Sequence, residues 1–125
     1  MKNNNIIVTK SRDFAVKIIR LYQFLSSEKK EYVLSKQILR SGTSIGANIK
    51  EAIRGQSKAD FYAKLNISLK ESSETEYWLD LLHETKYIND DLFQVMLSDN
   101  IELSKILTAI LKTRSKKNII TNYEL

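Results

Sequence analysis

The chain has 125 residues, a formal net charge of +5, and neither cysteine nor proline. The lack of cysteine excludes a disulfide framework and any thiolate metal or redox centre. The length predicts one domain with its own core. Its apolar runs are shorter than the roughly seven residues of a signal peptide or the roughly 18 of a membrane helix, so we expect a cytoplasmic protein without membrane contact.

The first predicted helix covers residues 11–27, with Ser11 as its N-cap and Asp13 in its first turn. Residues 1–9 are expected to form a partly ordered arm before it. The apolar residues of this helix recur at steps of four and three, which is the helical period. They are Phe14, Ile18, Leu21 and Leu25.

The second predicted helix starts at Ser35, with Leu34 placed to pack on Leu39, and ends at Gly55. Its inner stripe consists of Leu34, Ile38, Ser41, Ile45, Asn48 and Ala52.

Two of the three glycines of the chain, Gly42 and Gly46, lie inside this second helix. Each costs about 1 kcal/mol relative to alanine in a helix. Small residues four apart let another backbone approach closely, so we expect a neighbouring helix to pack against them. The small polar middle of the third helix is the candidate neighbour: Ser68, Ser72 and Thr75. The alternative is a kink or a break in the helix.

The third predicted helix begins with a capping box formed by Ser57 and Asp60 and reaches Thr85. Its inner stripe consists of Phe61, Leu65, Ser68, Ser72, Thr75, Leu79 and Leu82. The fourth predicted helix begins near Asn89, and residues 116–125 are expected to form a partly ordered tail. Its inner stripe consists of Leu92, Met96, Asp99, Leu103, Ile106, Ile110 and Thr113.

Four long helices joined by short connections predict an all-α fold, an antiparallel up-down-up-down four-helix bundle. We expect residues 1–125 to form one domain with its core at about residues 8–115.

The stretches "TSIGANIKEA" and "KESSETEYWL" resemble the 23S rRNA intervening-sequence protein family over about residues 8–115. First found in intervening sequences of bacterial 23S ribosomal RNA genes, these are four-helix bundles without a known catalytic activity. The family is related to the accessory variability protein of diversity-generating retroelements, which forms a ring of five and binds nucleic acid and a reverse transcriptase. The resemblance implies a bacterial, cytoplasmic homo-oligomer, with a pentamer as first expectation. The matching signature positions are Ser44, Asn48, Glu51, Asp60, Phe61, Glu71, Glu74 and Trp78.

The residues for catalysis or metal binding are few. His83 is the only histidine, and Asp80 three residues before it resembles only half of a di-iron helix motif. We therefore predict no catalytic residue, cofactor or metal, and a histidine at the surface or a helix end.

Polar residues of the second and third helices could meet. Glu71, Glu74 and Trp78 share one face of the third helix, and Asn48 and Glu51 share one face of the second. If the faces meet, we expect a buried polar network that includes Ser72 and Thr75, with Lys64 or Arg40 as the basic partner. Buried carboxylates need such a partner. A structural role is the main interpretation, and a ligand or partner site is the alternative.

Basic residues dominate the first half of the chain. Residues 1–70 hold 14 Lys/Arg against 5 Asp/Glu, residues 71–111 hold 2 against 9, and residues 112–125 hold 4 against 1. We predict a basic surface on the first two helices that binds RNA or DNA phosphates. The alternatives are a solvated surface, or a protein–protein adaptor whose basic half meets an acidic partner. The candidate residues are Lys10, Arg12, Lys17, Arg20, Lys36, Arg40, Lys50 and Arg54, with Lys58 beside them.

Overall fold

The computed structural model describes the backbone of residues 2–122 and the side chains of residues 5–114. The four helices are α1 (Lys2–Ser27), α2 (Leu34–Ile53), α3 (Lys58–Glu84) and α4 (Asp90–Asn122). The predicted all-α four-helix bundle is confirmed.

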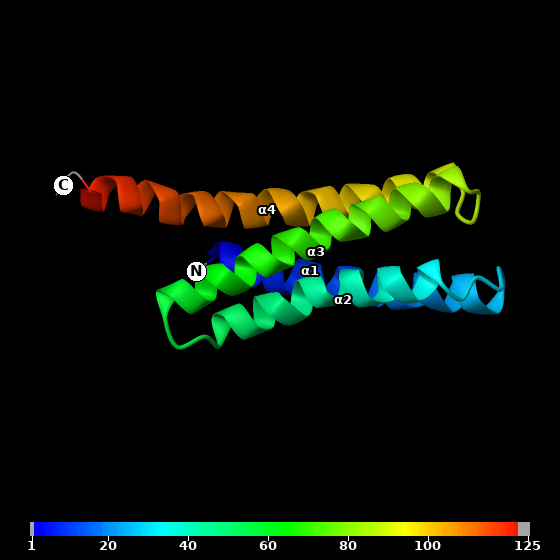
Figure 1. The fold of residues 1–125 in the computed structure, drawn as a ribbon, viewed down its shortest axis with the longest axis horizontal. Helices are drawn as coiled ribbons and strands as arrows, with labels where there is room; N and C mark the ends of the chain where they lie inside the picture. Colours follow the sequence, from blue (N-terminus) through cyan, green and yellow to red (C-terminus); the bar gives the residue numbers. More distant parts are fainter. Residues whose placement is uncertain (1, 123–125) are drawn as a thin grey trace.

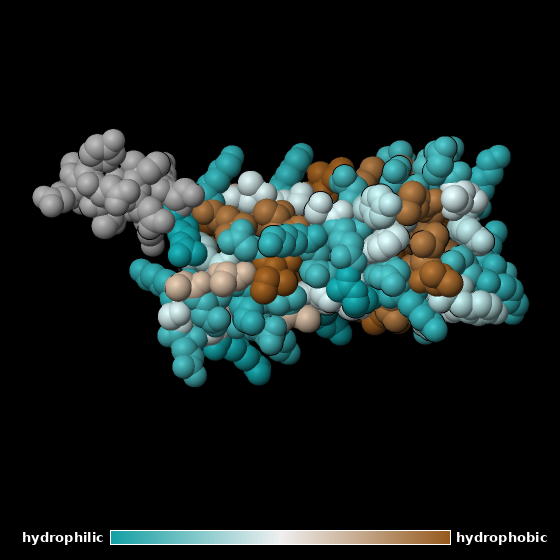
Figure 2. Space-filling view, in the orientation of Figure 1, coloured by the Kyte–Doolittle hydropathy of each residue, from teal (hydrophilic) through white to brown (hydrophobic). Residues whose placement is uncertain are grey.

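The chain reverses direction at each connection, so helices that follow one another lie antiparallel (Figure 1). α2 contacts α1 and α3, and α4 contacts α3 and α1; within the described residues the diagonal pairs have no close backbone contact. The face in Figure 2 is mostly hydrophilic, and its apolar residues form separate patches. The buried apolar residues of all four helices form one cluster, so each helix turns a stripe toward a shared core.

The core confirms the apolar stripe predicted for α1, because Phe14, Ile18, Leu21 and Leu25 are all buried. The predicted start of this helix is wrong. α1 begins at Lys2, and Ser11 is a buried interior residue whose hydroxyl donates to the carbonyl of Val8 at 3.2 Å. Burial of Ile7 gives the earlier residues an anchor on the core. Residues 2–9 thus continue the helix where an arm was expected.

The buried stripe of α4 differs from the predicted one at four of its seven positions: Asp99 and Ile106 are replaced, Leu92 is only half-buried, and Thr113 is exposed. It consists of Met96, Asn100, Leu103, Leu107 and Ile110. Asn100 and Leu107 replace the predicted Asp99 and Ile106, because Asp99 turns toward a lysine of α1. The backbone of α4 continues to Asn122, where a tail was expected from residue 116, and residues 123–125 lie outside the described residues.

The helix starts use three different caps. The Ser57 hydroxyl accepts from the amide of Asp60 at 3.0 Å, as predicted for α3, and Asn89 caps α4 by accepting from the amide of Leu92 at 2.8 Å. α2 begins at Leu34, one residue before the predicted Ser35, and the Ser35 side chain does not cap it. Instead the Glu31 carboxylate accepts from three backbone amides, those of residues 33, 34 and 35. A carboxylate there also meets the positive end of the helix dipole.

The α2 glycines lie in a continuous helix and face α1. A Cβ added at Gly42 would lie 2.6–2.9 Å from three side-chain atoms of Ile18, and one added at Gly46 would lie 3.3 Å from Ser11 Oγ. The predicted close approach is confirmed, but the predicted neighbour, α3, is wrong. α3 instead contacts the neighbouring face of α2, where its side chains bond to Ser41 and to the Ile45 carbonyl.

Candidate nucleic-acid interface

The small polar residues of α3 bond to its two neighbouring helices. Ser68 donates to the Ile45 carbonyl at 2.9 Å, and Thr75 donates to Ser41 Oγ at 2.9 Å. All four residues are buried, so these hydrogen bonds satisfy polar groups that would otherwise be costly inside the core. The α2–α3 contact is therefore specified by polar pairing as well as by apolar packing.

The buried pair between Ser72 and Asn100 joins α3 to α4. Ser72 Oγ donates to Asn100 Oδ1, and Asn100 Nδ2 donates back to the Ser72 carbonyl, both at 2.9 Å. Only 1% of either residue is exposed. Sequence reasoning found Ser72 but missed Asn100, whose signal was a polar residue four after Met96 and three before Leu103. The pair fixes the relative position of the two helices.

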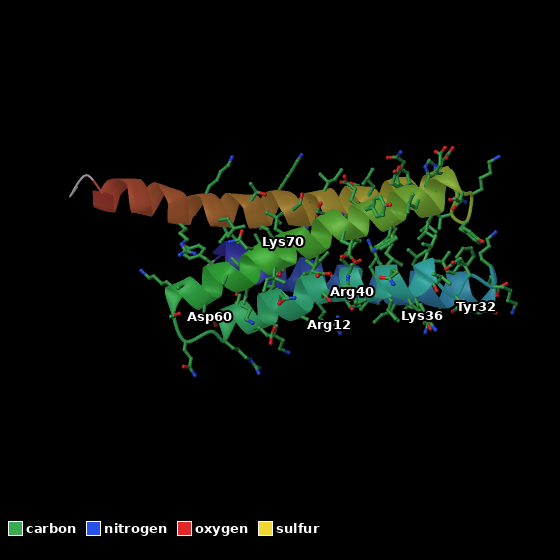
Figure 3. All side chains as sticks on the ribbon, in the orientation of Figure 1. Arg12, Tyr32, Lys36, Arg40, Asp60 and Lys70 are labelled. Carbon is green, nitrogen blue, oxygen red and sulfur yellow. The ribbon has the colours of Figure 1, made fainter. Side chains whose placement is uncertain are left out.

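A second polar cluster lies between α2 and α3 and is partly open to solvent. Arg40 contacts Glu71 at 3.3 Å and also binds Glu74, while Trp78 Nε1 donates to Glu74 Oε2 at 3.0 Å. Figure 3 shows Arg40 between the two helices. The Trp78 N–H, with the Arg40 guanidinium, lowers the pKa of Glu74, and the hydrogen bond to Glu74 raises the pKa of Arg40. Arg40, rather than Lys64, is the basic partner.

The other signature positions lie apart from this cluster. Ser44 and Asn48 bond to backbone carbonyls of their own helix, at Arg40 and Ser44 respectively, and Glu51 is exposed. Asp60 lies at the start of α3 (Figure 3), and the Phe61 ring meets Tyr62 edge-on at 5.2 Å. The polar residues predicted as one network are thus divided among several separate sets of contacts.

Three of the predicted cations are used in contacts between helices. Lys10 pairs with Glu102 at 3.1 Å, and Lys17 pairs with Asp99 at 2.6 Å, so both tie α1 to α4. Arg40 ties α2 to α3 as described above. The basic first half and the acidic third quarter of the chain therefore attract each other inside one bundle, and these three cations are already neutralised by neighbours.

Three other predicted cations surround a groove between α1 and α2, with a volume of about 710 Å³. Arg12 comes from α1, Lys50 comes from the last turn of α2, and Arg54 directly follows α2. The groove lining within residues 5–114 contains no carboxylate, and Asp13, 4.0 Å from Arg12, lies outside it. The rest of the lining is small or apolar: Asn5, Val8, Thr9, Ser11, Ala15, Thr43, Gly46, Ala47 and Ile53.

The small residues explain why the groove lies here. Gly46 and Ser11 bring the two backbones together, and Ala15 and Ala47 leave the space beside this contact unfilled. Arg12, Lys50 and Arg54 are exposed, so their charged ends lie in water. Their stems flank the apolar floor of the groove, which consists of Val8, Ala15, Ala47 and Ile53. Val8 and Ile53 are 37% and 47% exposed at this site. The arrangement suits a ligand that is both anionic and partly apolar.

Arg20 and Lys36 are exposed and lie outside the groove. Lys36 lies on α2 between Arg40 and the α1–α2 connection (Figure 3). Neither forms an ion pair with a described side chain. Lys58 is exposed at the first residue of α3. The structure thus brings three of the eight candidate cations to one groove and separates the others.

The histidine lies at the α3–α4 connection. His83 Nε2 is 2.6 Å from Asp90 Oδ1, and its ring stacks on Phe93 with centroids 4.0 Å apart. The acidic partner is therefore Asp90, not Asp80. Among the side chains placed by the structure, no group of three His, Cys, Asp or Glu residues could hold a metal ion. No described helix combines the length and the apolar character that a membrane span requires.

The fold defines a small four-helix bundle in which buried hydrogen bonds join α3 to α2 and α4. The sequence model of the 23S rRNA-intervening sequence protein family matches residues 3–109, and the chain belongs to that family. It is similar to the crystal structure of a protein with unknown function from the S23 ribosomal protein family of Bacteroides thetaiotaomicron. The two are 55% identical with a TM-score of 0.87, over 88% of this chain and 98% of that one. No curated protein matches. The predicted family resemblance is confirmed.

Proposed function

We propose that the protein is a non-enzymatic oligomer that binds phosphate groups of RNA or DNA through the part of the basic surface of α1 and α2 that lines the groove between them. The observation that carries this proposal is the groove where Arg12, Lys50 and Arg54 converge without a carboxylate in the described lining. Lys10, Lys17 and Arg40 are assigned instead to the contacts between helices.

Binding of this kind depends on salt, because each phosphate contact releases condensed counterions. Three cations predict a slope of about −2 to −3 in log affinity against log salt for one groove. Such contacts hold the backbone without reading sequence. In an oligomer, a pentamer by resemblance, copies of the groove act on one strand and raise the overall affinity.

The test compares two variants with the same change of charge. Lys50→Gln/Arg54→Gln removes two groove cations, and Lys36→Gln/Arg20→Gln removes one lysine and one arginine outside the groove. Glutamine avoids placing a carboxylate at the negative end of α2. Affinity for RNA and duplex DNA is measured by fluorescence anisotropy between about 50 and 200 mM salt.

We expect the groove variant to lose at least about tenfold in affinity and the control less than about threefold, because only the former removes close phosphate contacts. Circular dichroism checks that both variants fold. Equal losses in the two variants, or an affinity that does not depend on salt, would contradict the proposal.

A protein–protein adaptor is the second candidate function. It is favoured by the exposure of Val8 and Ile53 beside the groove, since apolar residues among cations can also anchor a partner protein. Light scattering with and without RNA separates the candidates. A groove variant that loses its oligomer and keeps its RNA affinity would support the adaptor.

A further inference from the structure

We propose that the groove between α1 and α2 holds single-stranded nucleic acid in preference to a duplex, with bases lying on its apolar floor. This inference rests on the proposed function and names the form of nucleic acid that the same groove takes. It is carried by the combination of cations on both walls with an open apolar floor between them.

The placement of the cations is the first step. Arg12 stands on the α1 wall, whereas Lys50 and Arg54 stand on the α2 wall. A strand lying along the groove can present phosphates to both walls. A duplex is much wider than the space between two packed helices, which is about 8–10 Å between axes, so it can touch only the outer rim.

The apolar floor is the second step. Ala15, Ala47 and the partly exposed Val8 and Ile53 offer apolar surface next to the charges. In a duplex the base faces are stacked on each other, and contact is mainly with phosphate and sugar. In a single strand the base faces are free and can cover apolar side chains. The floor therefore contributes binding energy only to the single strand.

The lining also limits how selective the groove can be. It contains no aromatic side chain for strong stacking, and Asn5 is its one amide side chain among the described residues. Aromatic stacking is the usual source of high affinity for single strands. We therefore expect a preference for single strands over duplexes that is modest in size and tolerant of base sequence.

The test uses Ala47→Leu, which fills the groove, and Ala63→Leu as matched control. Both alanines are exposed helix residues, so the same change adds the same bulk without entering the core. Each protein is titrated with an oligouridine of about 12 nucleotides, an RNA duplex of equal length and an abasic strand of equal length. The duplex carries more charge per length, so electrostatics alone would favour it.

We expect the wild type to bind oligouridine at least about fivefold more tightly than the duplex or the abasic strand, because only oligouridine offers free bases. Ala47→Leu should remove this preference by weakening oligouridine alone, and Ala63→Leu should leave it intact. Equal binding of the three ligands by the wild type would overturn the inference, as would equal effects of the two leucine substitutions.

The outcomes separate this inference from the proposed function. Suppose that Lys50→Gln/Arg54→Gln lowers the affinity for all three ligands, while Ala47→Leu changes the three affinities equally. The phosphate site then stands, and the single-strand preference is wrong. If no ligand binds in a salt-dependent way, the proposed function itself fails. A changed oligomer mass in Ala47→Leu with unchanged oligouridine affinity would assign the groove to a contact between copies and overturn the inference.

Discussion

α2 meets its two neighbours in different ways. Toward α1 it presents Gly42 and Gly46, and the absence of a Cβ lets Ile18 lie where a side chain would otherwise clash. Toward α3 it presents Ser41, whose hydroxyl accepts a hydrogen bond from Thr75. Small residues thus serve two purposes in one helix: those without polar groups allow close approach, and those with hydroxyls specify a partner.

The same difference appears on the surface. Between α2 and α3, Arg40 is occupied by Glu71 and Glu74. Between α1 and α2, the groove cations have no carboxylate among their described lining neighbours. The polar interface uses its charge to hold the bundle together, and the close-packed interface leaves its charge available. This contrast is why the proposed binding site lies on α1 and α2.

The largest effect is expected at Asn100 of α4, which forms the buried pair with Ser72 of α3. Asn100→Asp keeps the shape but replaces the donor to the Ser72 carbonyl with a buried negative charge. At neutral pH we expect a loss of about 3 kcal/mol in the free energy of unfolding, the scale of an uncompensated buried charge. Urea unfolding followed by circular dichroism measures it.

The pH dependence of this variant gives a second readout. A protonated aspartic acid can donate to the Ser72 carbonyl, so the loss should shrink as the pH is lowered toward about 4, near the ordinary carboxyl pKa. Asn66→Asp makes the same chemical change at an exposed position of α3 and is the control. A similar loss in both variants would show that Asn100 does not form the buried pair.

The next largest effect compares the two glycines. Gly42→Ala and Gly46→Ala each gain about 1 kcal/mol of helix propensity. The new Cβ at 42 would lie 2.6 Å from fully buried Ile18, whereas the one at 46 would lie 3.3 Å from Ser11 Oγ and 3.4 Å from the Ser11 carbonyl oxygen, which is a much milder approach. Overpacking costs about 1–3 kcal/mol, so we expect Gly42→Ala to be about 2 kcal/mol less stable than Gly46→Ala.

Urea unfolding of both variants measures this difference. Because the propensity gain is the same, it cancels in the comparison and leaves the packing cost. Ile18→Ala removes all three side-chain atoms that would clash, so it should cost less stability in the Gly42→Ala background than in the wild type. Equal stability of the two alanine variants would show that α1 does not pack closely at Gly42.

Helical periodicity was sufficient to predict the four helices and most of the core. Period and spacing place Phe14 and Leu25 on one face, because a helix has a fixed number of residues per turn. The helical period does not determine which neighbouring helix each face contacts. That depends on the rotation of each helix in the bundle, so the small residues of α2 and α3 were matched to each other although Gly42 and Gly46 face α1.

The candidate site was predictable in composition but not in arrangement. The excess of cations in residues 1–70 is visible in the sequence. Which of them are neutralised depends on contacts between residues far apart in the chain, such as Lys17 with Asp99. The sequence also did not indicate the Glu31 cap, because a glutamate three residues before the first residue of a helix has the pattern of an ordinary loop residue.

The smallest expected effect concerns the charged cluster at the α2–α3 interface. The Trp78 N–H and Arg40 lower the pKa of Glu74 in the folded state. The resulting stabilisation is complete above the ordinary carboxyl pKa of about 4.3 and is lost as the pH falls through the lowered folded pKa. Because the side chains are 35% and 52% exposed for Glu74 and Arg40, solvent keeps it below about 1 kcal/mol.

Glu74→Gln should therefore be slightly less stable than the wild type at pH 7, and the two should converge as the pH falls toward about 3. Trp78→Phe removes the donor that contributes most and should move the pKa of Glu74 back toward its ordinary value. Unfolding by urea across this pH range measures both, with Glu76→Gln removing the same charge from an exposed position of α3 as control. A difference between wild type and Glu74→Gln that persists undiminished at about pH 3 would mean that Glu74 stabilises the helix contact by packing rather than by its charge.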